Sequence, residues 1–508
     1  MPEYLSPGVY VEELSTGPRP IEGVSTSTLG FVGQTERGPA NPRLITSFLD
    51  YSRLYGGLSA ERSYLPYAIK GFFDNGGQRA YLTRVTGNGA ALATAGQDLI
   101  ISAIGAGEWG NGLFARIDAG KRSGFRLTIL YYADPPAALQ GDPLDPANRT
   151  DRRPDESEVY DNLSADPASS TYVVTMVNGG SHLVQVDWAA NHQAGAAPAN
   201  MGYTKFQNGA DGAAAGLADY KAGLDRLDPV DDISILCIPD EVRPGLGQLR
   251  VDLQDNCELN RYRFAILQVD QGQGDVGAFV TGALGGYPDS SYVGLYYPWI
   301  NVVDDATNET ILIPSGGHVA GIYARTDDER GVHKAPANEE VRGILLADRG
   351  DTRPLEFTVT KGQQDVLNPV GVNVIRDFRH TNRGIRVWGA RTRSSDPLWK
   401  YVNVRRLFIF LEKSIDEGTQ WVVFEPNDEP TWASVRRSIT NFLIRVWRDG
   451  ALMGPTQDDA FFVKCDRTTM TEDDILNGRL ICYVGVAPVR PAEFVIIRIS
   501  QKTIEAPQ

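Results

Sequence analysis

The chain has 508 residues, of which 42% are hydrophobic and 22% charged, and its formal net charge is −15. At about 100 to 200 residues per domain, this length predicts roughly three domains. The acidic balance argues against nucleic acid as the main partner, because neutralising phosphates requires a basic surface. The N-terminus has no secretory signal, and no apolar run approaches the ~20 residues of a membrane helix. We therefore expect a chain assembled in the cytoplasm that does not insert into a membrane itself.

The four cysteines are Cys237, Cys257, Cys465 and Cys482. None forms a CxxC pair, and their spacing does not match a zinc site. Most have apolar or strand-like neighbours, which favours reduced, buried thiols over a metal or redox role. No metal or cofactor is predicted, and the thiols point weakly to a reducing compartment.

The first 22 residues carry four prolines, which exclude a helix over most of this stretch. Between the prolines we predict one short strand, formed by Val9, Tyr10, Val11 and Glu12. A lone terminal strand has no hydrogen-bond partners of its own. It must therefore join a sheet, either in its own chain or in a neighbour.

Two regions have the pattern of alternating strands and helices. Residues 23–90 predict a strand at 28–32, a helix at 64–74 and a strand at 80–85. Farther along, three apolar runs at 233–238, 263–269 and 291–297 are separated by helical spacers. This order predicts a mostly parallel sheet.

Residues 91–205 differ in composition, with Ala, Gly, Asp and Pro dominant and the stretch 134–170 especially polar. We expect an inserted, solvent-facing domain with a long loop, whose turns and strands come from 105–112, 125–132 and 172–177. The role of 134–200 is not indicated by any motif.

The last 110 residues predict two helices and a final strand. The first helix begins at Asp396-Pro397 and ends at Gly418. The second follows Asn427–Pro430, ends at Gly450, and carries an apolar stripe made of Trp432, Val435, Ile439, Phe442 and Val446. A strand over 494–500 then places Val495, Ile497 and Ile499 on one face and needs a sheet to join.

No enzymatic motif is present. The chain lacks a GxxxxGK[ST] phosphate loop, an HExxH pair and a GxSxG elbow. His318 lies near Ser315, but a triad is defined by spatial geometry, so we favour a packed or surface histidine in a turn. Acidic pairs at Asp327-Asp328 and Asp473-Asp474 are more typical of solvated or interface positions than of acid/base chemistry. No catalytic residue is predicted.

Several segments together resemble one family. They are 4–13, 72–77 followed by 80–85, 107–112, 208–212, 331–338, 401–406, 424–427 and 447–450. The most specific is Pro314-Ser-Gly-Gly-His-Val-Ala-Gly-Ile-Tyr-Ala-Arg-Thr-Asp327. In order and number these motifs resemble the contractile tail sheath proteins of phages and of related extracellular contractile injection systems.

The resemblance implies a multidomain chain of α/β and α+β class. An α/β core domain would be built from both chain ends, with a subtilisin-like, non-catalytic middle α/β domain, an inserted β-rich outer domain and extended terminal β-arms. The corresponding segments are an arm at 1–22, core at 23–90, outer domain at 91–205, middle domain at 206–390, inner-wall core at 391–488 and a second arm at 489–508.

The resemblance also implies a structural, non-enzymatic subunit that forms a helical homopolymer around an inner tube protein and contracts to drive the tube through a target membrane. Baseplate and terminator or cap proteins would be further partners, and the location would be a virion tail or an assembled injection particle. Strand exchange between subunits would use Val9, Tyr10, Val11, Glu12, Val495, Ile496, Ile497 and Ile499.

The resemblance places the tube on the inner-wall segment, where two sets of residues are candidates for contact. One is acidic: Glu472, Asp473 and Asp474. The other comprises Arg436, Arg437 and Arg445, with Arg448 nearby. Two alternatives to the sheath hypothesis stay open: a serine-hydrolase-like enzyme on the middle domain, and a baseplate or tube component.

Overall fold

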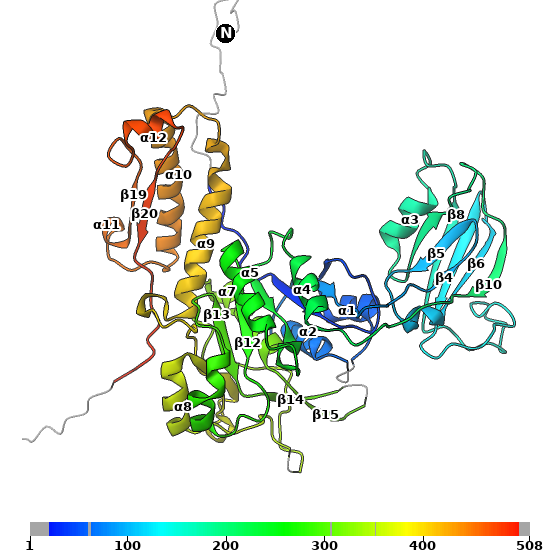
Figure 1. Ribbon diagram of the computed structural model, residues 1–508, viewed down its shortest axis with the longest axis horizontal. Coiled ribbons are helices and arrows are strands. Elements are labelled where there is room, and N and C mark those ends of the chain that lie inside the picture. Colours follow the sequence, from blue (N-terminus) through cyan, green and yellow to red (C-terminus); the bar gives the residue numbers. More distant parts are fainter. Residues whose placement is uncertain (1–19, 59–61, 305–306, 351, 497–508) are drawn as a thin grey trace, which may run out of the picture. The chain divides into compact units, whose positions relative to one another are not determined.

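The computed structural model describes residues 20–58, 62–304, 307–350 and 352–496. The chain divides into two compact units, one formed by 25–405 and the other by 1–24 together with 406–508 (Figure 1). The predicted strand at 9–12 and residues 497–500 of the predicted C-terminal strand lie outside the described residues.

The larger unit is organised around a nine-stranded sheet. Its six central strands are parallel, and the strands beyond them are antiparallel. In spatial order the strands are β16 (Glu339–Glu340), β18 (Ile385–Val387), β17 (Val372–Asp377), β13 (Val293–Tyr297), β12 (Phe264–Gln268), β11 (Ile235–Cys237), β1 (Leu29–Gly33), β3 (Ala80–Arg84) and β2 (Arg43–Ile45). The predicted strands of both α/β regions are confirmed, because parallel strands covered on both faces need continuous apolar runs.

Helices cover both faces of this sheet. On one face α2 (Leu65–Asp74) packs on α7 (Gly316–Arg330), and Phe31 of β1 meets Phe72 of α2 with ring centroids 6.0 Å apart. The neighbouring Val32 points the other way, into the core formed with α4 (Leu217–Asp225) and α5 (Leu249–Asn260). Successive residues of one strand thus supply two separate cores.

Residues 23–90 are grouped differently from the prediction. We expected them to form a core domain with the C-terminal segment, but β1 pairs with β11, matching Leu29 to Ile235 and Phe31 to Cys237. The first segment is therefore part of the middle sheet. The physical reason is that β1 is fully buried, so the N–H and C=O groups along both of its edges need partner strands, and β3 supplies only one.

The inserted region is β-rich, as predicted. One sheet contains β10 (Met201–Lys205), β6 (Leu113–Ala119), β7 (Phe125–Tyr131) and β8 (Glu156–Leu163); the other contains β4 (Thr94–Ala95), β5 (Leu99–Ala103) and β9 (Val184–Trp188). The prediction of turn or strand at 172–177 is wrong, because α3 (Val173–Gly180) forms there. Val173 and Val177, one helical turn apart, are both buried in the core of this region, and this packing overrides their β-propensity.

The smaller unit contains most of α9 (Val402–Thr419), α10 (Glu429–Arg448), α11 (Gln457–Ala460), α12 (Glu472–Leu476) and a hairpin of β19 (Phe461–Lys464) and β20 (Tyr483–Val486). The second predicted helix is confirmed: Asp428 caps α10 by accepting from the Thr431 N–H at 3.1 Å, and the whole predicted stripe is buried. The first begins later than predicted. Asp396 caps only a 3-10 turn at Pro397–Trp399, because Thr392 bonds the carbonyls of Trp399 and Lys400.

The larger unit also contains α1 (Phe48–Tyr55), α6 (Val276–Thr281), α8 (Lys361–Leu367) and a separate hairpin of β14 (Ile300–Val303) and β15 (Thr310–Ile313).

Candidate functional site

The first place to look for a ligand site is the topological switch point of the large sheet, where the strand order reverses. This point lies between β1 and β11, because the chain adds strands in one direction from β1 and in the opposite direction from β11. Open α/β sheets bind ligands beyond the carboxyl ends of the strands at such a point. Here Asp240, just after β11, fills that position. It is fully buried and accepts hydrogen bonds from Tyr220 Oη at 2.7 Å, the Tyr64 N–H at 2.8 Å, Arg243 Nε at 3.0 Å and Ser63 Oγ. Protein side chains close the switch point.

The next residue, Glu241, is a second fully buried carboxyl group. Its Oε1 accepts from the Gln268 N–H at 2.7 Å and from Gln268 Nε2 at 2.9 Å. Desolvation raises the pKa of Glu241 to about 8, although Arg250 opposes the shift. The group is buried behind the first turn of α7, where a Cβ on Gly316 would lie 2.7 Å from Gln268 Cδ. It is a core element without a path for substrate.

The Ser315 and His318 pair is also sealed inside the protein. The pair does not form the predicted turn, since His318 lies in the first turn of α7, and both side chains are buried. Burial lowers the pKa of His318 to about 4. Gly71 of α2 packs directly on the imidazole, where a Cβ would overlap the ring. The motif at 314–327 therefore encodes a tight helix crossing, and its serine and histidine are not presented to solvent.

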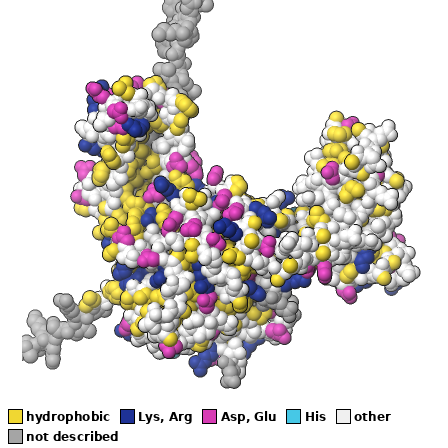
Figure 2. Space-filling model, viewed as in Figure 1, with side chains coloured by type: hydrophobic (Ala, Val, Ile, Leu, Met, Phe, Trp, Pro, Cys, Tyr) yellow, Lys and Arg dark blue, Asp and Glu magenta, His cyan; other side chains and the backbone are white. Residues whose placement is uncertain are grey.

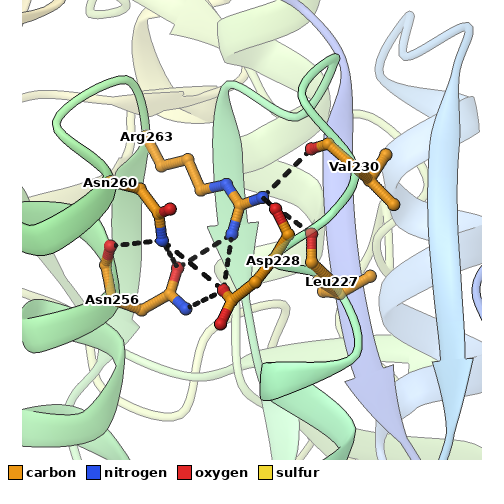
Figure 3. A network of polar contacts seen from close by, with 6 residues as sticks. All are labelled: Leu227, Asp228, Val230, Asn256, Asn260 and Arg263. Carbon is orange, nitrogen blue, oxygen red and sulfur yellow. Dashed lines mark hydrogen bonds and ion pairs between the residues drawn. The ribbon is translucent and has the colours of Figure 1, made fainter.

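Arg263 is the centre of a buried polar network at the start of β12 (Figure 3). Its Nη2 donates to the carbonyls of Leu227 at 2.7 Å and Val230 at 3.0 Å, and its Nη1 donates to Asn256 Oδ1 at 3.0 Å. Asp228 lies 3.3 Å from the same guanidinium. The network ties the loop after α4 to α5 and β12, which is a structural role.

The smaller unit exposes large hydrophobic side chains at its surface. Figure 2 shows hydrophobic side chains gathered over the unit that holds α9 and α10. Phe424, Phe462, Tyr483 and Met453 of this unit are all exposed. Large apolar side chains that gather on a surface in this way mark an interaction site.

The β19–β20 hairpin offers two open edges. Within the described part of the chain it is a two-stranded sheet, with pairs from Phe461↔Val486 to Lys464↔Tyr483. A two-stranded hairpin is marginal alone, and its outer N–H and C=O groups form a template for a further strand. On one face the Phe462 ring packs over Gly485, where a side chain would clash. The hairpin is thus shaped to take up additional strands.

Helix α10 holds this hairpin in place. Arg436 donates to the carbonyl of Cys465 at 3.3 Å, just beyond β19. At the start of α10, Trp432 Nε1 donates to Asn427 Oδ1 at 2.8 Å, and Asn427 in turn donates to the carbonyl of Arg479 at 3.1 Å. The loop joining the two strands is therefore bonded to the same helix that supports them.

Both chain ends leave from the smaller unit. Ile21 is buried against Gly418 of α9, its carbonyl accepts from Arg445, and the Val24 N–H donates to Ser414 Oγ at 3.2 Å. At the other end the Val489 N–H donates to the carbonyl of Ala451 at 3.1 Å. These anchors fix where each predicted arm begins.

The exchange residues themselves are only partly described. Val9, Tyr10, Val11, Glu12, Ile497 and Ile499 lie outside the described residues. Val495 and Ile496 are 78% and 77% exposed and are not in a strand in this single chain. Their use in strand exchange stays a prediction.

The acidic tube candidate has internal partners. Thr471 and Asp474 form a capping box at the start of α12, and Arg479 pairs with Asp473 and with Asp474, each at 2.9 Å. Asp473 and Glu472 are nevertheless exposed. The segment therefore presents carboxylates at the surface on a locally ordered turn.

The arginine candidates do not form one face. Arg436 bonds toward the hairpin, whereas Arg445 bonds toward the N-terminal segment at Ile21. The two residues are nine positions apart, about two and a half turns, so they lie on opposite sides of the helix. Arg437 and Arg448 are both exposed and stay on a common side of α10.

Two family models match this chain. The phage tail sheath protein central domain matches residues 213–393, and the phage tail sheath C-terminal domain matches 394–502. Together they cover more than half of the 508 residues. The chain belongs to the phage tail sheath family.

Similar proteins support this membership. The tail sheath protein of Burkholderia phage BcepMu is 32% identical over 170 residues, which are 32% of this chain and 34% of that protein. The chain aligns with less than half the length of each curated relative it matches. Among solved structures, the contracted helical sheath of the anti-feeding prophage is 26% identical, with a TM-score of 0.60 over 98% of this chain and 100% of that one. The contracted sheath of the extracellular PVC injection system shares the fold, with 23% identity, a TM-score of 0.62 and 99% coverage of both chains.

One surface residue of this sheath family member was missed from the sequence. Phe424 is fully exposed and has φ of 70°, a left-handed conformation that is rare for a bulky residue. It lies in the motif at 424–427, which indicated a family resemblance but gave no sign of the unusual backbone conformation.

Among the described residues, no helix has the length and apolarity needed to cross a membrane.

Proposed function

We propose that this chain is the repeating subunit of a contractile sheath, which polymerises helically around an inner tube and contracts to drive that tube through a target membrane. The observation that carries the proposal is the open-edged β19–β20 hairpin on the unit from which both chain ends leave. Membership of the tail sheath family supports it.

The arms would connect subunits by adding strands to a neighbour's hairpin. Backbone hydrogen bonds would supply affinity, and alternate side chains such as those of Val9 and Val11, or Val495 and Ile497, would supply specificity. The bodies would rotate while these ladders hold, and the prolines at 18, 20, 488 and 491 would serve as semi-rigid spacers between each arm and its body.

Contraction would be driven by surface buried between subunits. At about 25 cal/mol per Å² of apolar area, a few hundred Å² gained per subunit supplies several kcal/mol. Summed along a sheath, this is enough for work on a membrane without a nucleotide, in agreement with the missing phosphate loop.

Electron microscopy of the purified chain, in negative stain and without nucleotide, tests the proposal. We expect striated hollow tubes. Deleting residues 1–14 should abolish these tubes while leaving a folded monomer by circular dichroism and gel filtration. Normal tubes from the deletion would refute strand exchange through the N-terminal arm.

The partners would be other copies of this chain, an inner tube protein, and baseplate and cap proteins. For the tube we favour the acidic turn at Glu472 and Asp473, because these exposed carboxylates are neighbours on one short turn, whereas Arg436 and Arg445 lie on opposite sides of α10. Assembly would take place in the cytoplasm, and the product would be a virion tail or an injection particle.

A baseplate role is the second candidate, since a chain in the anti-feeding prophage baseplate structure is 26% identical with a TM-score of 0.57. A baseplate-restricted subunit would form single rings instead of long tubes under the same conditions. The hydrolase alternative predicts labelling by a fluorophosphonate probe, which the buried Ser315 does not favour.

A further inference from the structure

Two of the four cysteines are placed opposite each other at the end of the β19–β20 hairpin where its connecting loop begins. Cys465 directly follows β19, and Cys482 directly precedes β20. The ladder pairs Phe461 with Val486 and continues one residue at a time to Lys464 with Tyr483. The next step in the same register opposes Cys465 to Cys482.

The hydrogen-bond pattern also suits a covalent link. The Ala487 N–H donates to the carbonyl of Ala460 at 2.9 Å, which marks 460/487 as a hydrogen-bonded pair. Pairs alternate along an antiparallel ladder, so extending the register one step beyond Lys464↔Tyr483 puts 465/482 at a non-hydrogen-bonded position, for which Cα atoms are about 4.5 Å apart. Disulfides span Cα separations of roughly 4.4 to 6.8 Å.

Both thiols share one environment. Cys465 is buried in a small apolar cluster with Trp432 and Met470, and the half-buried Cys482 packs against that same cluster. A hydrogen bond from Cys482 lowers the pKa of the Cys465 thiol, and the charge of Arg436 adds to this effect. Cys465 is therefore the more acidic thiol of the pair, whereas Cys482 is the more exposed one.

We propose that Cys465 and Cys482 are a redox-sensitive pair, reduced during synthesis and joined as an intrachain disulfide when the chain meets a small-molecule disulfide oxidant. The bond would staple the strands at the base of the loop 466–481, which carries α12. This proposal does not depend on the sheath function, although a fixed hairpin would strengthen any strand that adds to it.

The exchange balances with oxidised glutathione as the oxidant. Cys482 is half-buried, so it is the thiol that the oxidant can reach: it loses its proton, and its thiolate attacks one sulfur of glutathione disulfide, forming a mixed disulfide and expelling one glutathione thiolate, which takes up a proton. Cys465 loses its proton and attacks the Cys482 sulfur, releasing the second glutathione thiolate, which takes up a proton. The two cysteines lose two electrons and two protons, and the glutathione disulfide gains both.

The other two cysteines serve as internal controls. Cys237 and Cys257 are fully buried in the larger unit, and burial raises the pKa of each thiol. Cys257 belongs to the core on the α4–α5 face of the sheet, whereas Cys237 packs against Gly316 of α7 on the opposite face. The sheet separates them, so they cannot pair.

The test uses the full chain, purified under reducing conditions and then exposed to excess oxidised glutathione. After quenching with N-ethylmaleimide in denaturant, we expect the intact mass to show that two hydrogens have been lost and that only two thiols are alkylated. After digestion, one pair of peptides should be linked through Cys465 and Cys482. Dithiothreitol should restore four alkylated thiols. Cys482→Ser should abolish the internal link, and the matched Cys257→Ser variant should retain it.

Three outcomes would overturn the proposal: four free thiols, separate glutathione adducts on Cys465 and Cys482, or a link between two chains. The wild-type measurement decides the matter even if a variant fails to fold.

Discussion

Gly317 of α7 lies directly against the backbone of Ala68 in α2. A Cβ added at Gly317 would lie 2.6 Å from the carbonyl carbon of Ala68, closer than real Cβ contacts allow. One turn later a Cβ on Gly321 would lie 2.7 Å from the Asn75 Cβ. The glycines of the motif at 314–327 thus permit a close helix crossing over the large sheet, and they account for the most specific stretch of the sequence without any catalytic role.

Gly317→Ala should therefore destabilise the fold. The clash is with backbone, which cannot move aside easily, and overpacking of this kind costs about 1–3 kcal/mol. The measurement is urea unfolding of the unassembled chain followed by circular dichroism.

Gly362→Ala is the matched control for that variant. Gly362 also lies in a helix, α8, and a Cβ there meets no atom within 4 Å. Alanine should raise stability at this site by about 0.5–1 kcal/mol. Equal effects at both positions would contradict the helix-crossing argument.

Arg263→Lys should cost about 2–3 kcal/mol, because an ammonium group cannot reach the Leu227 and Val230 carbonyls and Asn256 together. Arg261→Lys, two residues earlier on the exposed surface, keeps the charge and should change stability by less than about 0.5 kcal/mol. The readout is the midpoint of urea unfolding. An unchanged midpoint for Arg263→Lys would show that the network in Figure 3 contributes little.

Five strands of the large sheet, β1, β3, β11, β12 and β13, were predictable because nearly all of their residues are buried and their segments are mainly apolar, whereas the outer strands β2 and β16 are short, partly exposed and were not predicted. How the segments group was not predictable from sequence, since the pairing of Leu29 with Ile235 joins residues over 200 positions apart and leaves no local signal. The same limit applies to α3, where the burial of Val173 and Val177 decides the conformation. It also applies to Asp396, because the hydrogen bonds of Thr392 occupy carbonyls of this segment and α9 begins only at Val402.

Of the candidate assembly site, only the donor strands at the two chain ends were predictable from the sequence. Their apolar alternation at residues 9–12 and 494–500 marks them as strands without partners. The hairpin that we propose as acceptor has strands of only four residues, 461–464 and 483–486, separated by a polar loop. The arginine candidates were found as a group in the sequence, but Arg436 and Arg445 lie on opposite sides of α10, half a helical rotation apart.

Stability should fall as the pH rises from about 4.5 to 8, through the contribution of Glu241. Its pKa is about 8 in the folded chain and 4.5 as a model value, so over this range the folded state holds a proton that the unfolded state has lost. The contribution is complete below pH 4.5 and is lost as the pH passes 8, with a slope of up to about 1.4 kcal/mol per pH unit. Urea unfolding at pH 5.5 and 8.5 measures it.

Glu241→Gln should flatten this dependence, because the amide stays neutral at both pH values and can still accept from Gln268. Glu329→Gln, on the exposed end of α7, should leave the wild-type slope unchanged. His318 acts at lower pH and in the opposite direction: its pKa of about 4 means that its contribution is lost as the pH falls below 6.5. Identical slopes for wild type and Glu241→Gln would show that the carboxyl group is charged in the folded chain.

Val484→Pro should block sheath assembly without unfolding the monomer. In the register of the hairpin, 483/464 and 485/462 are the hydrogen-bonded pairs, so the N–H of Val484 points to the open edge of β20, where an added strand would bind. Proline removes that donor and is tolerated at sheet edges. Val484→Thr retains the N–H and serves as the control, which should still form tubes in negative stain. Tubes formed equally well by both variants would mean that the added strands use the β19 edge instead, and Val463→Pro, which removes the corresponding outward N–H of β19, would then be the variant that prevents them.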